Sequence, residues 1–194
     1  MGTGEAGLMT GRYDMVCADI CMDSQRSKAA LFSIPITYNP NYVFVRKDDN
    51  RFDEDPEKLN DPSVKFAVLP NTILDYSVKS KYPKAGRVDV NDLQGNVDLI
   101  MTVNSHKADA SVNLMISLDQ YNANNPKEQV KIVGAALRDC SGSYQLPMGE
   151  FALKHMIDNA ITEINMGDRV KNIMLKYMPD DRRYWRSPAK AYQE

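Results

Sequence analysis

The sequence is poor in the residues that build most metal and redox sites. It has two histidines, His106 and His155, and three cysteines, with no CxxC pair. This spacing indicates neither a cysteine-rich zinc site nor a disulfide framework, although two of the three cysteines could still pair and leave one free. The histidines lie too far apart for an HExxH motif. We therefore expect no metal, no cofactor and no histidine-based catalytic site.

The chain also lacks an excess of positive charge. Its 24 Lys and Arg residues against 26 Asp and Glu residues give a net charge of -2. That balance argues against nucleic acid or an anionic membrane as the main partner. The one basic cluster of note, Arg182, Arg183 and Arg186, lies beside Asp180 and Asp181 and is expected to be a solvated tail.

No apolar run approaches the length of a transmembrane helix. The first residues, MGTGEAGLMTGRYD, lack the basic and apolar regions of a signal peptide, so secretion is not visible here. With 194 residues, 43% of them hydrophobic, the chain can form one large domain or two small ones.

Short apolar runs alternate with helical stretches, which predicts an α/β fold. The candidate strands are 13–20, 42–46, 65–69, 87–90, 110–114 and 130–133. The clearest helix is predicted over 150–166, where apolar residues recur at the 3.6-residue period. Gly167 is expected to end it in the left-handed conformation, and Asp168 to cap the helix that follows.

Two polar breaks divide the chain into lobes. They fall at 39–41, which contains Pro40, and at 139–143. Because they flank a self-contained set of strands, they indicate an inserted lobe joined to the rest by two crossings. We predict lobe 1 from residues 1–41 plus 139–194, and lobe 2 from residues 42–138.

The stretch GRYDMVCADICMDSQRSKAALFSIPI, residues 11–36, contains a specific series of residues. In order they are Gly11, Tyr13, Asp14, Arg26, Phe32, Ser33 and Pro35. This series resembles the signature of type II periplasmic solute-binding proteins of the polar amino-acid type, also called bacterial extracellular solute-binding proteins, family 3. Further similarity covers most of the remaining chain, at 43–47, 65–72, 107–110, 144–149 and 159–163.

The resemblance implies a two-lobed α/β fold, periplasmic binding protein-like II, that closes over a small-molecule ligand. Such proteins lie in the periplasm or outside the cell and pass their solute to the permease of an ABC importer. A complete member begins with a strand, a helix and a strand, whereas only ten residues precede Gly11 here. Lobe 1 is therefore expected to be incomplete at its N-terminus. A truncated product, a fragment, or a subunit completed by a second chain would each account for this.

The resemblance also names candidate ligand contacts in lobe 1. Arg26 matches the arginine whose planar guanidinium holds a carboxylate through two parallel hydrogen bonds. Ala18, Asp19 and Cys21 match the small residues that line the cleft. Asp19 is an unusual residue there: it could receive a ligand ammonium, or pair with Arg26 or Lys28 in the empty site. Cys21 could line the pocket or be inert packing.

In lobe 2, Pro70, Asn71 and Thr72 precede a predicted helix. Exposed backbone N–H groups and the Thr72 hydroxyl could meet an anionic group, or Asn71 or Thr72 could cap its own helix, and both can hold together. The acid that amino-acid binders use for the α-ammonium would fall at Leu114, so it is absent, and Asn113 is the nearest polar residue.

Binding without catalysis is the favoured prediction. Two rival functions remain open: the ligand-sensing domain of a receptor, and an enzyme resembling cyclohexadienyl dehydratase, which would need paired acid and base groups in the cleft. A third alternative is that the chain binds nothing because half of its cleft is missing.

Overall fold

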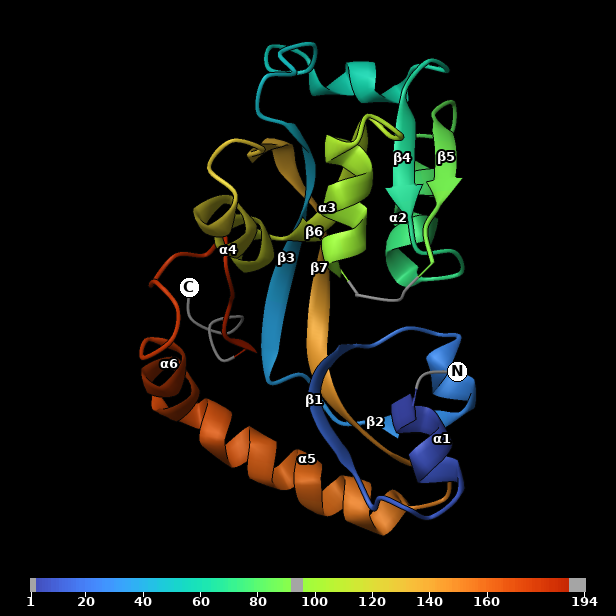
Figure 1. Cartoon of the computed structure of the whole chain (residues 1–194). Coiled ribbons are helices and arrows are strands. Elements are labelled where there is room, and N and C mark those ends of the chain that lie inside the picture. Colours follow the sequence, from blue (N-terminus) through green and yellow to red (C-terminus); the bar gives the residue numbers. More distant parts are fainter. Residues whose placement is uncertain (1–2, 92–95, 189–194) are drawn as a thin grey trace. The chain divides into compact units, whose positions relative to one another are not determined.

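The computed structural model describes residues 3–91 and 96–188 (Figure 1). The chain divides into two compact units, unit 1 with Met1–Asn39 and Cys140–Glu194, and unit 2 with Pro40–Asp139. The division predicted from the sequence differs by two residues at the first crossing and by one at the second. Strands and helices mix in the order expected for an α/β protein, which confirms the fold class.

Unit 2 is built on three short strands, on most of the long strand β3 and on the first part of β7 (Val130–Pro147), with helices between them. Strand β3 (Thr37–Arg46) pairs antiparallel with β6 (Ala110–Leu114), and β4 (Lys65–Val68) pairs parallel with β6 and with β5 (Gly86–Asp89). The helical elements are η2 (Pro56–Asn60), α2 (Ile73–Lys81), α3 (Asn96–Asn104) and α4 (Met115–Asn124). Of these, neither η2 nor α4 was predicted.

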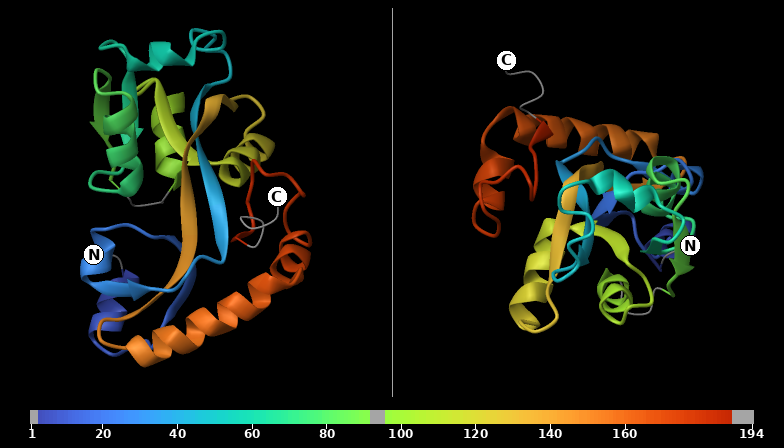
Figure 2. Two further views of the ribbon diagram at one scale, coloured as in Figure 1. Left: turned by 180° about the vertical axis from the view of Figure 1, so that it is seen from behind. Right: turned by 90° about the horizontal axis from the view of Figure 1, so that it is seen from above.

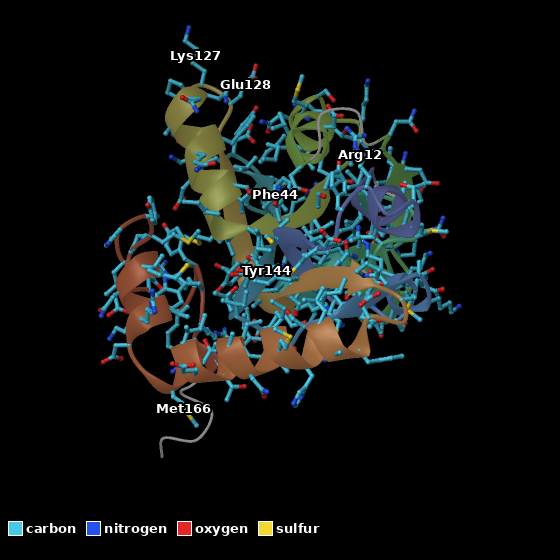
Figure 3. The ribbon with its side chains drawn as sticks, turned by 90° about the horizontal axis from the view of Figure 1, so that it is seen from below. Arg12, Phe44, Lys127, Glu128, Tyr144 and Met166 are labelled. Carbon is cyan, nitrogen blue, oxygen red and sulfur yellow. A yellow bond between two sulfur atoms is a disulfide. The ribbon has the colours of Figure 1, made fainter. Side chains whose placement is uncertain are left out.

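Both faces of the unit 2 sheet are covered by apolar side chains. Along β3, Val43 and Val45 belong to one buried cluster while Phe44, between them, belongs to another. Successive side chains of a strand point to opposite faces, so this alternation means that β3 has a core on each side. Phe44, labelled in Figure 3, is fully buried. Unit 2 thus has the layers that a stable domain needs.

Unit 1 is built around the second half of β7 (Val130–Pro147). Strands β1 (Val16–Cys21) and β2 (Ala30–Phe32) both pair with it antiparallel, and β1 lies at one end of the strand order β1-β7-β3-β6-β4-β5. The helical elements are α1 (Thr3–Met9), η1 (Arg26–Lys28), α5 (Phe151–Met166) and α6 (Arg169–Met174), and Figure 2 shows α5 as the longest of them. No helix in the described ranges is long and apolar enough to cross a bilayer.

The two polar breaks proved to be parts of long strands. Pro40 lies within β3, and residues 139–143 lie within β7. Proline removes one backbone donor, and a strand tolerates this where that donor is not needed for pairing. The residues typical of turns therefore mark the two places where the chain passes between units. The backbone nevertheless stays extended through both breaks.

The end of α5 also differs from its prediction. The helix stops at Met166 as expected, but Gly167 is extended, with φ -106° and ψ -177°, and not left-handed. Asp168 precedes α6 without a side-chain capping hydrogen bond. The predicted end of the helix is thus correct, but the left-handed Gly167 and the Asp168 cap that were predicted there are not.

One disulfide joins Cys21, at the end of β1, to Cys140, where β7 enters unit 1. The cysteines are 119 residues apart in sequence and their Cα atoms 5.0 Å apart. Cys17 is free and exposed. The sequence left open whether two of the three cysteines pair. The structure contains such a pair and leaves one cysteine free. Because the closed loop includes all of unit 2, the bond removes much freedom from the unfolded chain.

We predict that Cys140→Ser lowers the free energy of unfolding by about 2–5 kcal/mol, because the unfolded chain loses a constraint on a long loop. Urea unfolding of the oxidised protein measures the change, and reduction of the wild type should reproduce it. Cys17→Ser is the matched control and should leave the midpoint in place. Equal stability of the oxidised wild type and Cys140→Ser would show that the bond does not form in solution.

Candidate functional site

Arg26 lies in unit 1 at the start of η1, where local hydrogen bonds hold the backbone. Asp23 Oδ1 accepts from the Arg26 backbone N–H at 2.8 Å and from that of Gln25 at 2.8 Å. This Asx-type turn forms because an aspartate can bond to backbone two and three residues ahead. The turn sets where the Arg26 side chain leaves the chain.

The Arg26 guanidinium faces two acids but is not saturated by them. Its Nε lies 3.6 Å from Glu5 Oε1 and 3.5 Å from Asp23 Oδ2, and the side chain is 45% exposed. Within the described residues, no hydrogen bond from the guanidinium to a protein acceptor accompanies these charge contacts. Glu5 also accepts from Gln145 Nε2 at 3.1 Å, and this bond anchors it to β7. A half-exposed guanidinium of this kind can still offer a planar pair of donors to a carboxylate.

Asp19 belongs to a separate polar cluster in unit 1. Asn39 Nδ2 donates to Asp19 Oδ2 at 2.5 Å, and Thr37 Oγ1 donates to Asp19 Oδ1 at 3.4 Å. Among the described residues, Asp19 therefore pairs with neither of the cations proposed for it: Arg26 faces Glu5 and Asp23, and Lys28 donates to Gln25. Burial raises the pKa of Asp19, and the hydrogen bonds from Asn39 and Thr37 lower it by less.

Gly142 of β7 makes this cluster sterically feasible. A Cβ at position 142 would lie 1.5 Å from Asp19 Oδ1 and 2.7 Å from Thr37 Oγ1. Any side chain there would displace the carboxylate, so glycine is required where Asp19 passes over β7. The phenol of Tyr144, labelled in Figure 3, lies near the same charge: burial raises its pKa, and the charges of Cys17 and Asp19 add to the rise.

The other predicted unit 1 residues lie in the same strand as Asp19. Ala18 is exposed on β1, and the sulfur of Cys21 is bonded to Cys140. Cys21 therefore presents no free thiol. The structure brings Ala18, Asp19 and Cys21 together on β1 and places Arg26 in the turn that follows.

In unit 2, the turn before α2 uses its polar groups internally. Asn71 has a left-handed backbone, φ 63°, and its N–H donates to Asp75 Oδ2 at 3.1 Å. Thr72 is the N-cap: its hydroxyl accepts from the Asp75 N–H at 3.3 Å and donates to the Leu69 carbonyl at 2.8 Å. The capping interpretation of Thr72 is therefore correct. Pro70 is exposed beside it.

Asp75 was not identified from the sequence and organises this turn. Its side chain is 0% exposed and accepts from Arg87 Nη1 at 2.6 Å and Lys79 Nζ at 2.9 Å. Burial alone would raise the pKa of Asp75, but hydrogen bonds from Lys79, Arg87 and the Asn71 N–H outweigh it and lower the pKa. One of the N–H groups expected to meet a ligand anion is thus bound by the protein's own carboxylate.

Asn113 lies at the end of β6, 1% exposed. Its Oδ1 accepts from the Leu114 N–H at 2.8 Å, and its Nδ2 approaches the Asn96 carbonyl at 3.5 Å. These contacts orient the amide between β6 and the start of α3. In the part of the chain that the structure describes, no three His, Cys, Asp or Glu side chains gather as metal ligands.

A family model described as bacterial extracellular solute-binding proteins, family 3, matches residues 3–180. No curated protein matches this sequence. Solved structures do: an ancestral amino acid-binding protein, a precursor of cyclohexadienyl dehydratase, is 24% identical with a TM-score of 0.70, over 90% of this chain and 73% of that one.

Two further structures have natural sources. A putative binding component of an ABC transporter from Wolinella succinogenes, complexed with lysine, is 13% identical with a TM-score of 0.75, over 92% of this chain and 75% of that one. A putative L-cystine ABC transporter protein from Listeria monocytogenes is 16% identical with a TM-score of 0.70, over 97% and 79%. At these identities the likeness shows the fold, that of two-lobed type II periplasmic binding proteins.

We predict that Asp19→Asn gains stability relative to the wild type as the pH rises above 3.8, the ordinary pKa of the group. The folded pKa is raised, so the folded wild type holds a proton that the unfolded chain releases, and wild-type stability falls through this window. Asp19→Asn lacks that loss. Thermal unfolding of both proteins from pH 3 to pH 7 measures the difference. The exposed Asp14→Asn is the control for a simple change in net charge, and a stability of Asp19→Asn that falls relative to the wild type as the pH rises would contradict the prediction.

We predict that Asp75→Asn lowers the free energy of unfolding at pH 7 by about 1–3 kcal/mol, because Lys79 and Arg87 lose their shared partner. Both cations are partly exposed, at 40% and 34%, which keeps the loss below that of a fully buried pair. The folded pKa of Asp75 is lowered, so its stabilisation is present above pH 3.8 and is lost as the pH falls. Glu57→Gln, which removes the exposed pair with Lys81, should cost much less.

Proposed function

Because this chain belongs to the bacterial extracellular solute-binding proteins of family 3, we propose that it binds a small solute bearing a carboxylate, an amino acid or a related compound, and delivers it to the permease of an ABC importer. The observation that carries the proposal is Arg26, a guanidinium that is 45% exposed and that follows β1 in a turn held by Asp23.

Arg26 is proposed to hold the ligand carboxylate. A guanidinium binds a carboxylate through two parallel hydrogen bonds, which fix the orientation of the ligand as well as its position. Glu5 and Asp23 contribute by holding the Nε side of the group without closing it off, at 3.6 Å and 3.5 Å. Ala18, which has no bulky side chain, is exposed on β1 and is proposed to line the same site.

Asp19 is proposed to receive a cationic group of the ligand, such as an ammonium. Its hydrogen-bond partners, Thr37 and Asn39, are neutral. A partly desolvated carboxylate without a cation beside it is stabilised when a ligand supplies the positive charge. In this sequence Leu114 occupies the position of the acid that amino-acid binders use for the α-ammonium. Asp19 would supply an acid in its place. Pro70, Asn71, Thr72 and Asn113 stay predictions as further contacts, with Thr72 and the Asn71 N–H already engaged internally.

The Cys21–Cys140 bond supports a place of action outside the cytoplasm, because disulfides persist in oxidising compartments. An enzyme of the dehydratase kind would need a second acid-base group close to Asp19. Asp19 accepts hydrogen bonds from an amide and a hydroxyl, and the phenol of Tyr144 lies near its charge, so it is the family of the chain that favours binding over proton transfer.

A thermal-shift screen with lysine, arginine, cystine, other amino acids and simple carboxylates tests the proposal. A ligand at about 100 times its dissociation constant should stabilise the protein by about 2.7 kcal/mol. Arg26→Ala should abolish the shift, and Arg26→Lys should weaken it, because an ammonium keeps the charge but loses the planar fork.

Arg12→Ala is the matched control, since Arg12 is an exposed arginine of the same unit that lies over the Tyr13 ring at 5.4 Å. It should keep the full shift. A ligand whose stabilisation survives Arg26→Ala would remove Arg26 from the site, and a screen without any shift would contradict the proposed function.

A further inference from the structure

Unit 2 contains a cavity that the candidate site does not use. Its volume is about 450 Å³, and it is lined by residues 46–48 at the end of β3, by Asn104 and His106 at the end of α3, and by residues 126–129 before β7. All of these residues belong to unit 2. Small-molecule sites commonly have volumes of about 300–1,000 Å³. The cavity is therefore large enough to hold a small ligand.

Hydrogen bonds hold the three walls of this cavity together. Arg46 Nη1 donates to two backbone carbonyls on either side of His106, at 2.8 Å and 2.9 Å, and so ties the end of α3 to β3. The Arg46 charge is met by Asp49, whose Oδ2 lies 3.3 Å from Nη2. Asn104 Nδ2 donates to the Glu128 carbonyl at 2.8 Å and ties α3 to the loop before β7. Walls that are already fixed reduce the cost of ordering the site when a ligand binds.

Four exposed charged side chains line the cavity without ion pairs. Lys47 and Asp48 follow β3, and Lys127 and Glu128 lie in the loop after α4, where Figure 3 labels them. Within residues 3–91 and 96–188 none of the four pairs with an opposite charge, and Lys47 Nζ donates to the neutral amide of Gln129. Two cations and two acids thus face one cavity without neutralising one another. A ligand that carries both an ammonium and a carboxylate complements charges arranged in this way.

His106 occupies a position at which the backbone favours glycine. Its φ is 59°, its N–H donates to the Val103 carbonyl at 3.1 Å, and the Lys107 N–H donates to the Thr102 carbonyl at 3.2 Å. The left-handed residue that ends a helix in this way is usually glycine, which adopts the conformation with less strain. Closure of the helix therefore does not account for an imidazole here. As part of the cavity wall, the ring offers a ligand one N–H donor and one acceptor nitrogen.

We propose that this cavity is a second ligand site, which binds a short peptide with a free ammonium and a free carboxylate. Lys47 and Lys127 meet the carboxylate, Asp48 and Glu128 meet the ammonium, and His106 adds a hydrogen bond. Because the charged side chains are exposed, each contact contributes little by itself, and the affinity depends on both ends of the ligand together. The site lies wholly in unit 2 and does not depend on the function proposed above.

Triglycine is the probe, and the parent protein for the test is the Arg26→Ala variant, so that the solute site proposed in unit 1 does not contribute. We expect saturable changes in the amide NMR shifts of Asn104 and Gln129 as triglycine is added. Triglycine amide lacks the carboxylate, and N-acetyltriglycine lacks the ammonium. Each should bind about threefold to fivefold more weakly than triglycine, because one exposed charge contact is lost.

Two further variants assign the ends of the peptide. Lys127→Gln should weaken triglycine binding by about threefold to fivefold and leave the binding of triglycine amide unchanged, because that ligand already lacks the carboxylate. Glu128→Gln should weaken triglycine binding and leave that of N-acetyltriglycine unchanged for the corresponding reason. Lys107→Gln, which removes an exposed lysine outside the cavity, is the matched control and should bind all three ligands as the parent does.

His106→Gly separates a binding role from a structural one. Glycine relieves the left-handed backbone, so the urea midpoint of unfolding should stay in place or rise, whereas triglycine binding should weaken. Loss of binding together with loss of stability would contradict the role of the ring in the site.

Three results would overturn the proposal. One is the absence of any saturable shift at millimolar triglycine. Another is equal binding of triglycine and its two blocked forms, which would show that the charges do not recognise the ligand. The third is triglycine binding that both Lys127→Gln and Glu128→Gln leave unchanged, which would place the peptide elsewhere. Because the parent protein lacks Arg26, none of these results bears on the proposed function, which the thermal-shift screen tests with Arg26 in place.

Discussion

The fold of unit 1 depends on β7, an 18-residue strand that begins in unit 2 and ends in unit 1. Strands β1 and β2 pair with its second half, the disulfide attaches to it at Cys140, and Gly142 leaves the space into which Asp19 extends. A change that displaced β7 would therefore move the strand pairing, the covalent link and the candidate site together. Because β7 runs from unit 2 into unit 1, the strand that connects the units also sets the position of the candidate unit 1 residues.

The two units are stabilised in different ways. Unit 2 has apolar clusters on both faces of its sheet and a buried carboxylate, Asp75, that fixes the entry into α2. Within the described ranges, unit 1 relies more on a disulfide, on polar clusters and on helix anchors such as Asp158, and part of the apolar side of α5 is exposed. Burial of apolar surface is the dominant favourable term in folding, so the unit with less of it gains most from a covalent constraint.

The charged residues of the candidate site show how neighbours decide the role of a side chain. Arg26 and Arg87 are both arginines beside acids, but Arg87 donates to a fully buried carboxylate at 2.6 Å, whereas Arg26 lies at 3.5 Å and 3.6 Å from its acids and stays half exposed. The first stabilises a turn, and the second is the arginine proposed to hold a ligand. Asp19 and Asp75 differ in the same way, since neutral partners surround one and cations the other.

The sequence by itself determined the elements that depend on local spacing. The strand over 110–114 and the end of the helix at Met166 follow from periodicity, and the family follows from the ordered residues between Gly11 and Pro35. The α/β class and the two-lobed family fold follow as well.

Only the tertiary structure decided which distant groups meet. Three cysteines allow several pairings, and the spacing alone could not choose Cys21 with Cys140 across 119 residues. Nor could it show that Glu5 reaches Arg26, or that Arg87 reaches Asp75 and closes the turn at Asn71. The physical reason is that periodicity and capping act over a few residues, whereas ion pairs, disulfides and strand edges depend on how the whole chain packs.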